Sequence, residues 1–341
     1  MKLEHQKNIQ MLNTLRIPSV ANAYVNCRSL LEIRQAIAWA CDHDKKVYVL
    51  GGGSNVIPLQ HIQGLVLQPK LKGIEVFVHN NDEVLVKAGA GENWHSIVCY
   101  CVERGYHGVE NLALIPGDMG AAPIQNIGAY GAELKDVFWQ LEALNIQTQQ
   151  LEVFDFADCD FGYRDSVFKN AKRDQYIITS VTLKLSTKAK PNLSYPALAS
   201  HLRERGIDNV DAKDILNAVI HIRRSKLPDP RLVPNAGSFF KNPVVSVQQY
   251  QTLLASFPDI PAYEVSLTQK KLAAAWLIEQ TGWKGKPLDK VLVHKDHALV
   301  LTNPSCEIAD KVLGLADAIA RDVRAKFDIS LELEPRLIGE L

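Results

Sequence analysis

The sequence of 341 residues contains no apolar run approaching the roughly 20 residues that a membrane-spanning helix needs. Its first residues also lack the apolar middle segment of a secretory signal. Neither sign of charge is in excess, because 38 Lys and Arg balance 38 Asp and Glu, and no long block of like charges occurs. We therefore expect a cytoplasmic protein with neither a membrane nor a nucleic acid as its partner.

Cysteine spacings typical of metal or redox sites are also missing. The six cysteines are far apart or on apolar faces, no CxxC occurs, and Cys99 and Cys101 cannot both face one metal from a helix. His294 and His297 have HxxH spacing, but no third ligand is placed beside them. The sequence predicts reduced thiols and no metal site.

The composition that remains is typical of a soluble globular protein, with 47% hydrophobic and 22% charged residues. The length favours two or three domains. No internal repeat is visible, and expected strands and helices interleave irregularly, which indicates an α+β fold.

Local patterns place the elements. A capping box of Ser29 and Glu32 predicts a helix beginning at Leu30, and Gly105 ends another. The three prolines within 226–237 indicate a boundary loop. Helices are expected at about 30–41, 94–102, 269–281 and 305–326. Strands are expected at 46–50 and 175–186, within 73–91, 138–154 and 291–303, and at 329–339, where Glu334 is on the polar face.

Two glycine-rich segments could hold a ligand. VYVLGGGSNV (47–56) follows a strand and is either a phosphate-binding nest or a tight turn, since it matches neither the P-loop nor the common dinucleotide pattern. The segment at 115–134 has little side-chain bulk. It is either a structural loop or a surface that a large flat ligand can approach, with Gln125 and Asn126 as hydrogen-bonding groups.

Three polar side chains could take part in chemistry. Arg164, in FGYRDSVFK, is either a carboxylate clamp or a solvated partner of Asp165. Ser238, in NAGSFFKNP, could be a nucleophile, a proton donor or the cap of a turn, although no GxSxG motif surrounds it. Glu334 could simply be exposed.

Considered together, these segments resemble one family. LGGGSN, AGAGENWHSIV, NLALIPGDMGAAPIQNIGAYGAEL, FGYRDSVFK, KLPDP, NAGSFFKNP, KLAAAWLIEQTGWKG and LEPRLIG occur in the order found in the UDP-N-acetylenolpyruvoylglucosamine reductases of peptidoglycan synthesis. The resemblance extends from about Asn13 to Gly339. PAYEVSLTQKKLAAAWLI resembles the type I branch, which has a tyrosine-bearing loop.

The resemblance implies an α+β fold with a two-lobed FAD-binding domain of the vanillyl-alcohol oxidase (PCMH) type. This domain would cover 13–188, with lobes at about 13–70 and 71–188. A substrate-binding α+β domain would cover 219–325, and a C-terminal strand at 326–341 would carry Glu334. The family also implies a monomer.

The implied cofactor is non-covalent FAD, with NADPH as the hydride donor. The FAD pyrophosphate would lie against the two glycine-rich segments. The residues implied in FAD binding are Gly51, Gly52, Gly53, Ser54, Asn55, Gly117, Gly120, Ala121, Ala122, Gln125, Asn126, Gly128 and Arg223. Some relatives have serines at positions 121 and 122, so backbone groups would replace one side-chain contact here.

The implied reaction adds a hydride to the enolpyruvyl CH₂ carbon of UDP-N-acetylglucosamine enolpyruvate and a proton to the neighbouring carbon. Arg164 and Glu334 would stabilise the enolate, and Ser238 would supply the proton. The residues implied in substrate binding are Tyr163, Tyr195, Lys226, Asn242, Tyr263, Lys271 and His297. His297 replaces a glutamine of relatives and could add pH dependence.

Two other functions stay open at this point. A flavin-dependent oxidase of alcohols or sugars would consume oxygen, and many such enzymes attach FAD through His or Cys, which both glycine-rich segments lack. A non-catalytic nucleotide-binding module would not need Arg164, Ser238 or Glu334.

Overall fold

The computed structural model describes residues 1–339, and these residues divide into two compact units. The first unit contains residues 1–7, 21–53 and 63–225, and the second contains residues 8–20 and 54–62 with the chain from Lys226 onward. The last boundary between the units along the chain falls between Ser225 and Lys226, and two short early segments belong to the second unit. The predicted end of the FAD-binding domain at residue 188 and the predicted start of the substrate-binding domain at residue 219 stay predictions.

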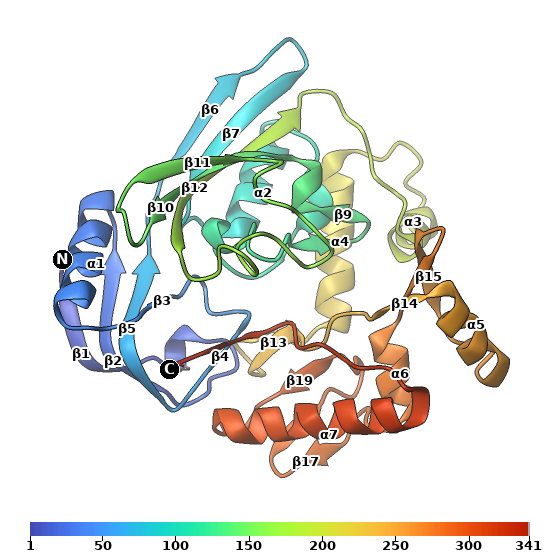
Figure 1. The fold of residues 1–341 in the computed structure, drawn as a ribbon. Coiled ribbons are helices and arrows are strands. Elements are labelled where there is room, and N and C mark those ends of the chain that lie inside the picture. The colour runs from blue at the N-terminus through green and yellow to red at the C-terminus, as the bar shows by residue number, and fades with distance from the viewer. Residues whose placement is uncertain (340–341) are drawn as a thin grey trace. The chain divides into compact units, whose positions relative to one another are not determined.

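One sheet of the first unit has the strand order β1-β2-β5-β3. Its strands are β1 (Leu3–Asn8), β2 (Val20–Cys27), β5 (His61–Pro69) and β3 (Val47–Val49). Helix α1 (Leu30–Asp42) buries Ile33, Ala36 and Ile37 in the same core as the inner residues of these strands (Figure 1). As predicted, the Ser29 side chain caps this helix by accepting from the N–H of Glu32.

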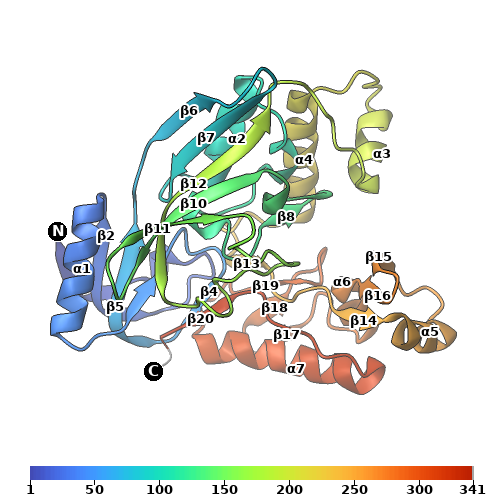
Figure 2. The same cartoon turned by 45° about the horizontal axis from the view of Figure 1, so that its top comes forward.

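A second sheet of this unit has five strands in the order β11-β10-β12-β7-β6, and all neighbours are antiparallel. Its strands are β6 (Ile74–Val78), β7 (Glu83–Gly89), β10 (Phe138–Asn145), β11 (Leu151–Asp155) and β12 (Tyr176–Ser186). Helices α2 (Trp94–Glu103) and α4 (Ala212–Lys226) lie on one side of it (Figures 1 and 2). Their buried residues share one core with β7, β10 and β12.

The first unit also contains shorter elements. They are β8 (Gly128–Ala129), β9 (Ala132–Glu133), α3 (Pro196–Glu204) and the 3-10 turns η2 (Glu110–Leu112), η3 (Met119–Ala121) and η4 (Leu134–Asp136).

The second unit contains a sheet of order β13-β19-β18-β17 and a smaller sheet of order β14-β16-β15. Their strands are β13 (Asn235–Ser238), β14 (Val244–Ser246), β15 (Ala262–Ser266), β16 (Gln269–Leu272), β17 (Pro287–Leu288), β18 (Val291–Val293) and β19 (Val300–Thr302). Its helices are η1 (Gln10–Leu12), α5 (Val247–Ser256), α6 (Ala274–Gln280) and α7 (Ala309–Phe327). In both views α7 runs along the four-stranded sheet (Figures 1 and 2).

A parallel pair joins distant parts of this unit. Strand β20 (Arg336–Ile338) pairs with β4 (Val56–Pro58). The strand predicted over 329–339 is therefore shorter than expected, because only its last part finds a partner strand and 329–333 make at most an isolated bridge at Leu333. Its predicted alternation is otherwise present, although Glu334 is half-buried rather than exposed.

The helix predicted over 269–281 is wrong in its first third. Gln269–Leu272 forms β16, which is hydrogen-bonded to β14 on one side and β15 on the other. Pairing on two edges outweighs the local helical pattern, so α6 begins only at Ala274. The α+β class and the other predicted strands are confirmed.

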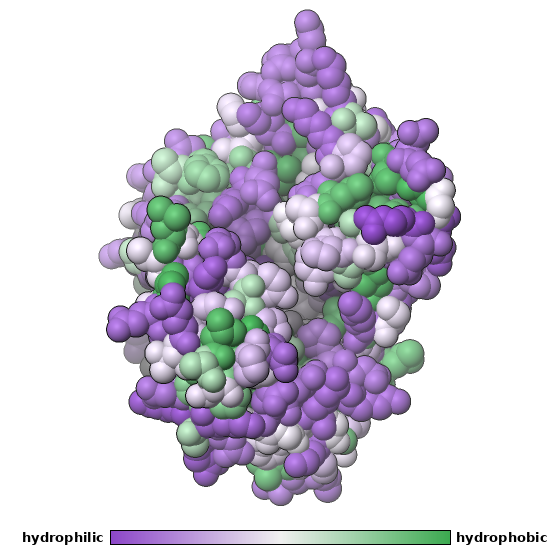
Figure 3. Space-filling model, turned by 90° about the vertical axis from the view of Figure 1, so that its right-hand side faces the viewer, coloured by the Kyte–Doolittle hydropathy of each residue, from purple (hydrophilic) through white to green (hydrophobic). Residues whose placement is uncertain are grey.

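On the face drawn in Figure 3, hydrophobic residues form separate groups among hydrophilic ones. No helix of the described residues is long and apolar enough to cross a membrane.

Candidate active site

The glycine turn after β3 lies against a second backbone segment. A side chain at Gly52 would place its Cβ 2.9 Å from the Cα of Gly117, a distance that side chains do not tolerate. Gly53 has φ +66°, which favours glycine. The N–H groups of Gly51 and Gly52 donate to no group of the described residues. Converging free N–H groups on a turn without side chains fit an anion such as a pyrophosphate.

The loop over 116–128 is fixed by its own neighbours. The Trp94 N–H donates to the Gly117 carbonyl at 3.1 Å, and the Gly120 N–H donates to that of Ala90 at 2.9 Å. A Cβ at Gly120 would lie 2.7 Å from that of Ala90. The small residues here are therefore needed for packing, and Ala121 is exposed while Ala122 is buried.

The Asn126 side chain is occupied within the protein. Its Nδ2 donates to Glu133 Oε2 at 3.0 Å and to the Gly162 carbonyl at 2.9 Å, while its Oδ1 accepts from the Lys135 N–H. The residue is fully buried. These bonds hold the Asn126 side chain within the protein, and its predicted contact with FAD stays a prediction. The neighbouring Gln125 is half-buried.

Two arginines of the first unit meet near this loop. Arg164 Nη2 donates to the carbonyl of Gly128 at 2.7 Å, and Arg164 has the left-handed φ of +54°. Arg223 projects from α4. Burial lowers the pKa of its guanidinium, the neighbouring charge of Arg164 lowers it further, and Tyr130 raises it. Two guanidinium groups that repel each other in a partly buried place would be stabilised by a bound carboxylate or phosphate.

Tyrosines surround this arginine pair. Tyr195, the N-cap residue of α3, packs edge-to-face on Tyr130 with ring centroids 5.1 Å apart. The Tyr163 ring centroid lies 5.8 Å from the Arg164 guanidinium. Asn111 Nδ2 donates to the carbonyls of Tyr130 and Asn192 and so fixes both segments. Sequence reasoning missed Tyr130, although it belongs to the glycine-rich segment already singled out.

Ser238 is the last residue of β13 in the second unit. It pairs with Val300 of β19, and the next two residues, Phe239 and Phe240, are fully buried. The Ser238 hydroxyl makes no hydrogen bond within the described chain, so it does not cap a turn. A half-buried hydroxyl on a fixed strand end can donate a proton to a bound molecule.

Glu334 is attached to the same strand end. Its N–H donates to the Phe239 carbonyl at 2.9 Å, and its carbonyl accepts from Asn55 Nδ2 at 3.2 Å. Asn55 and its neighbour Ser54, which follow the glycine turn, belong to the second unit. The structure thus brings Ser238, Glu334 and Asn55 together.

His297 lies in the turn between β18 and β19. Its buried ring atom Nδ1 has no hydrogen-bond partner among residues 1–339. Burial is the main cause that lowers its pKa, and His294 and Lys226 lower it further. The neutral ring is favoured, and it can exchange hydrogen bonds with a ligand.

Three other residues predicted to bind substrate lie on or next to the strands of the smaller sheet. Tyr263 and Lys271 are directly opposed on β15 and β16. The Asn242 Oδ1 accepts from the Ala274 N–H at 2.9 Å, while its Nδ2 donates to nothing in the described chain. Lys226, the exposed last residue of α4, begins the second unit. Residues 1–339 contain no cluster of three or more His, Cys, Asp or Glu suited to a metal.

Comparisons with known proteins identify both parts of the chain. Residues 21–153 match the model of an FAD-binding domain, and residues 229–338 match the C-terminal domain of UDP-N-acetylenolpyruvoylglucosamine reductase. A reductase of that name from Flavobacterium johnsoniae is 40% identical over 99% of this chain and 100% of its own length. One from Burkholderia vietnamiensis is 48% identical over 84% of this chain and 83% of its own.

The fold agrees with a solved relative. The crystal structure of UDP-N-acetylenolpyruvylglucosamine reductase from Thermus caldophilus superposes with a TM-score of 0.68, at 22% identity and over 99% of each chain. This confirms the predicted α+β fold with an FAD-binding domain followed by the C-terminal domain of this reductase family. The chain is thus an FAD-binding oxidoreductase, and it belongs to the UDP-N-acetylenolpyruvoylglucosamine reductase family.

Proposed function

We propose that this enzyme reduces UDP-N-acetylglucosamine enolpyruvate to UDP-N-acetylmuramate with NADPH, in the synthesis of the peptidoglycan precursor. Bound FAD would supply the hydride transfer. The observation that carries the proposal is the fixed pair of Ser238 and Glu334 at one strand end, in a chain of this family. We further propose that the protein acts as a monomer in the cytoplasm.

The pyrophosphate of FAD would be held by the free N–H groups of Gly51 and Gly52. Backbone groups at Gly53, Gly117, Gly120, Ala121, Ala122 and Gly128 would line the rest of its path. Because these positions carry small side chains, a flat ligand can approach the backbone closely. Gln125, Ser54, Asn55 and Arg223 would add polar contacts.

The negative charge that develops beside the substrate carboxylate needs positive charge or hydrogen-bond donors. Arg164 would provide its planar guanidinium, which its bond to Gly128 already orients. Glu334 can stabilise an enolate only when it donates a hydrogen bond, so its working state would be protonated.

Ser238 would deliver the proton that completes the reduction. One hydride would bond to the CH₂ carbon, the C=C π bond would break, and the Ser238 Oγ proton would bond to the neighbouring carbon. The free hydroxyl and the buried Phe239 and Phe240 agree with a proton donor held away from bulk water. Solvent would then reprotonate the serine oxygen.

The remaining polar groups would hold the sugar nucleotide. Tyr263, Lys271 and Lys226 suit a diphosphate, because phenol and ammonium groups donate hydrogen bonds to phosphate oxygens. Asn242 would contribute its free Nδ2, and His297 its unpartnered ring nitrogen. Tyr163 and Tyr195 would border the region around Arg164.

The test follows the flavin absorbance band of the purified protein without oxygen. NADPH should bleach the band, and UDP-N-acetylglucosamine enolpyruvate should restore it. Bleaching without recovery by this substrate would overturn the proposed acceptor. Bleaching of the band by an alcohol, followed by rapid recovery when oxygen is admitted, would instead support the oxidase alternative.

A further inference from the structure

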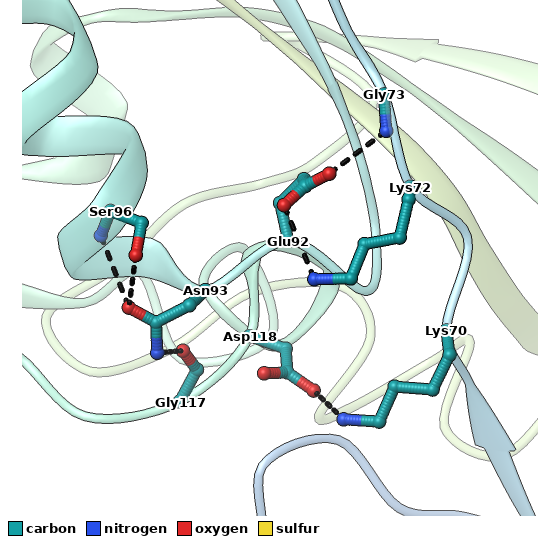
Figure 4. A network of polar contacts seen from close by, with 8 residues as sticks. All are labelled: Lys70, Lys72, Gly73, Glu92, Asn93, Ser96, Gly117 and Asp118. Carbon is teal, nitrogen blue, oxygen red and sulfur yellow. Dashed lines mark hydrogen bonds and ion pairs between the residues drawn. The ribbon is translucent and has the colours of Figure 1, made fainter.

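A group of charged side chains in the first unit contains two lysine–carboxylate pairs (Figure 4). One of its members, Asp118, lies next to the glycine turn. Lys70 and Lys72 belong to the connection between β5 and β6, and Asp118 precedes η3. Lys70 Nζ donates to Asp118 Oδ2 at 2.7 Å. Lys72 Nζ donates to Glu92 Oε2 at 3.2 Å.

The Asp118 carboxyl group projects from the backbone that contacts the glycine turn. The Cβ of Asp118 lies 4.0 Å from the position that a Cβ at Gly51 would occupy, and its N–H nitrogen lies 3.4 Å from such a Cβ at Gly52. Only 11% of the Asp118 side chain is exposed. A partly buried negative charge therefore stands next to the free N–H groups of Gly51 and Gly52, where it would repel a pyrophosphate.

Asp118 does not serve the local backbone. It occupies the N-cap position of η3, yet its side chain makes no capping hydrogen bond. Among the described residues, Lys70 is the one polar partner of this carboxylate. Lys70 is itself held in place, since its N–H donates to the Cys27 carbonyl at 2.7 Å.

We propose that Lys70 is a positioning residue for the anionic part of FAD, and that it acts by neutralising Asp118. The inference rests on the proposed placement of the pyrophosphate at the glycine turn. Lys70 does not need to contact the cofactor in this scheme. Removing Lys70 alone leaves a bare carboxylate beside the pyrophosphate, whereas removing both charges restores a neutral surface.

The test measures the Kd of FAD for the flavin-free full-length protein, from the quenching of flavin fluorescence at low salt. We expect Lys70→Met to weaken FAD binding about tenfold, since an uncompensated charge then faces the anion. Asp118→Asn should bind as the unchanged protein does, or more tightly. The double variant K70M/D118N should return close to the original Kd, and added salt should reduce the defect of Lys70→Met.

Lys72→Met is the matched control, because Lys72 is two residues away, more exposed and paired with Glu92. Its Kd should not change. If the double variant binds as weakly as Lys70→Met, Lys70 contacts the cofactor directly and the inference fails. If Asp118→Asn weakens binding as much as Lys70→Met, the pair is only a structural clamp and the inference also fails.

Folding is checked separately by circular dichroism of each variant. Should Lys70→Met not fold, Asp118→Asn alone decides, because weaker FAD binding by that variant overturns the inference and equal or tighter binding supports it. Absence of any FAD binding by the unchanged protein would overturn the proposed function itself. Normal binding with no effect of Lys70→Met would overturn only the role of Lys70.

Discussion

The backbone N–H of Glu334 is hydrogen-bonded to the carbonyl of Phe239 at 2.9 Å, so Glu334 is fixed one residue away from Ser238. The Asn55 side chain holds the Glu334 carbonyl. The proposed proton donor and one proposed stabiliser of the enolate therefore share a rigid backbone frame. Such a frame allows chemistry at one to be tested without moving the other.

Ser238→Ala should separate the two half-reactions. Bleaching by NADPH should be unchanged, while the recovery with substrate should slow by about 10²–10⁴-fold, because a positioned acid is lost. Stopped-flow absorbance without oxygen measures both steps. Ser246→Ala is the control, since the Ser246 side chain caps α5 and its loss should lower stability by about 1 kcal/mol without changing either step. Equal recovery rates in Ser238→Ala and the unchanged protein would refute the acid role.

Arg164→Lys should keep a positive charge but remove the planar group bonded to Gly128. We expect recovery with substrate to slow by about 10²-fold, since one preorganised donor to the developing charge is lost. Steady-state kcat should fall more than KM rises. Arg231→Lys is the control, because Arg231 is exposed and paired with Asp229. A change in KM alone would assign Arg164 to ground-state binding.

Gly52→Ala should damage the glycine turn, because its Cβ would lie 2.9 Å from backbone at Gly117. The shift it forces should destabilise the folded protein by about 1–3 kcal/mol and weaken FAD binding. Fluorescence titration and urea unfolding measure the two effects. The control is Gly314→Ala in α7, where an added Cβ would meet no atom within 4 Å beyond the adjoining helix backbone, and the change should stabilise the helix by about 0.5–1 kcal/mol. Unaltered FAD affinity in Gly52→Ala would show that the turn can open at little cost.

His297 should make stability depend on pH. Burial holds its pKa below the ordinary value of 6.5, so the unfolded chain binds more protons than the folded chain below that pH. This contribution to stability is present above pH 6.5 and is lost as the pH falls through the lowered pKa. His297→Gln should therefore flatten the decline of Tm between about pH 6.5 and 5.

The flattening should be partial, because burial also lowers the pKa values of His95 and His201. His61→Gln at an exposed site is the control, and its Tm profile should match that of the unchanged protein. A His297→Gln profile parallel to the original would show that the folded and unfolded chains protonate this ring alike.

Local signals predicted much of the fold. The Ser29 cap, the β6–β7 turn and the end of α2 near Gly105 depend on neighbours within a few residues, and the structure has all three. Helix α5 was missed although Ser246 caps it by accepting from the Gln249 N–H. The start of α6 was misplaced because pairing with two other strands, which no local pattern records, decides the state of Gln269–Leu272.

The candidate site was only partly accessible from the sequence. Glycine content located both segments that we propose to face FAD, because close backbone approach at Gly52 and Gly120 excludes larger residues. The hydrogen bonds from Asn126 to Glu133 and Gly162 were not predictable, since they form only when separate segments of the chain fold together. The proximity of Asn55 to Glu334 likewise links residues 279 positions apart.

The pairing of β4 with β20, next to Asn55 and Glu334, has a consequence for biosynthesis. Because β4 pairs in parallel with β20, an early segment of the chain has no partner strand until Arg336–Ile338 have left the ribosome. Loop closure over such a distance is slow compared with the formation of a hairpin such as β6–β7. We therefore expect the five-stranded sheet to assemble first, and the frame that holds Glu334 to form only after residues 334–338 have left the ribosome.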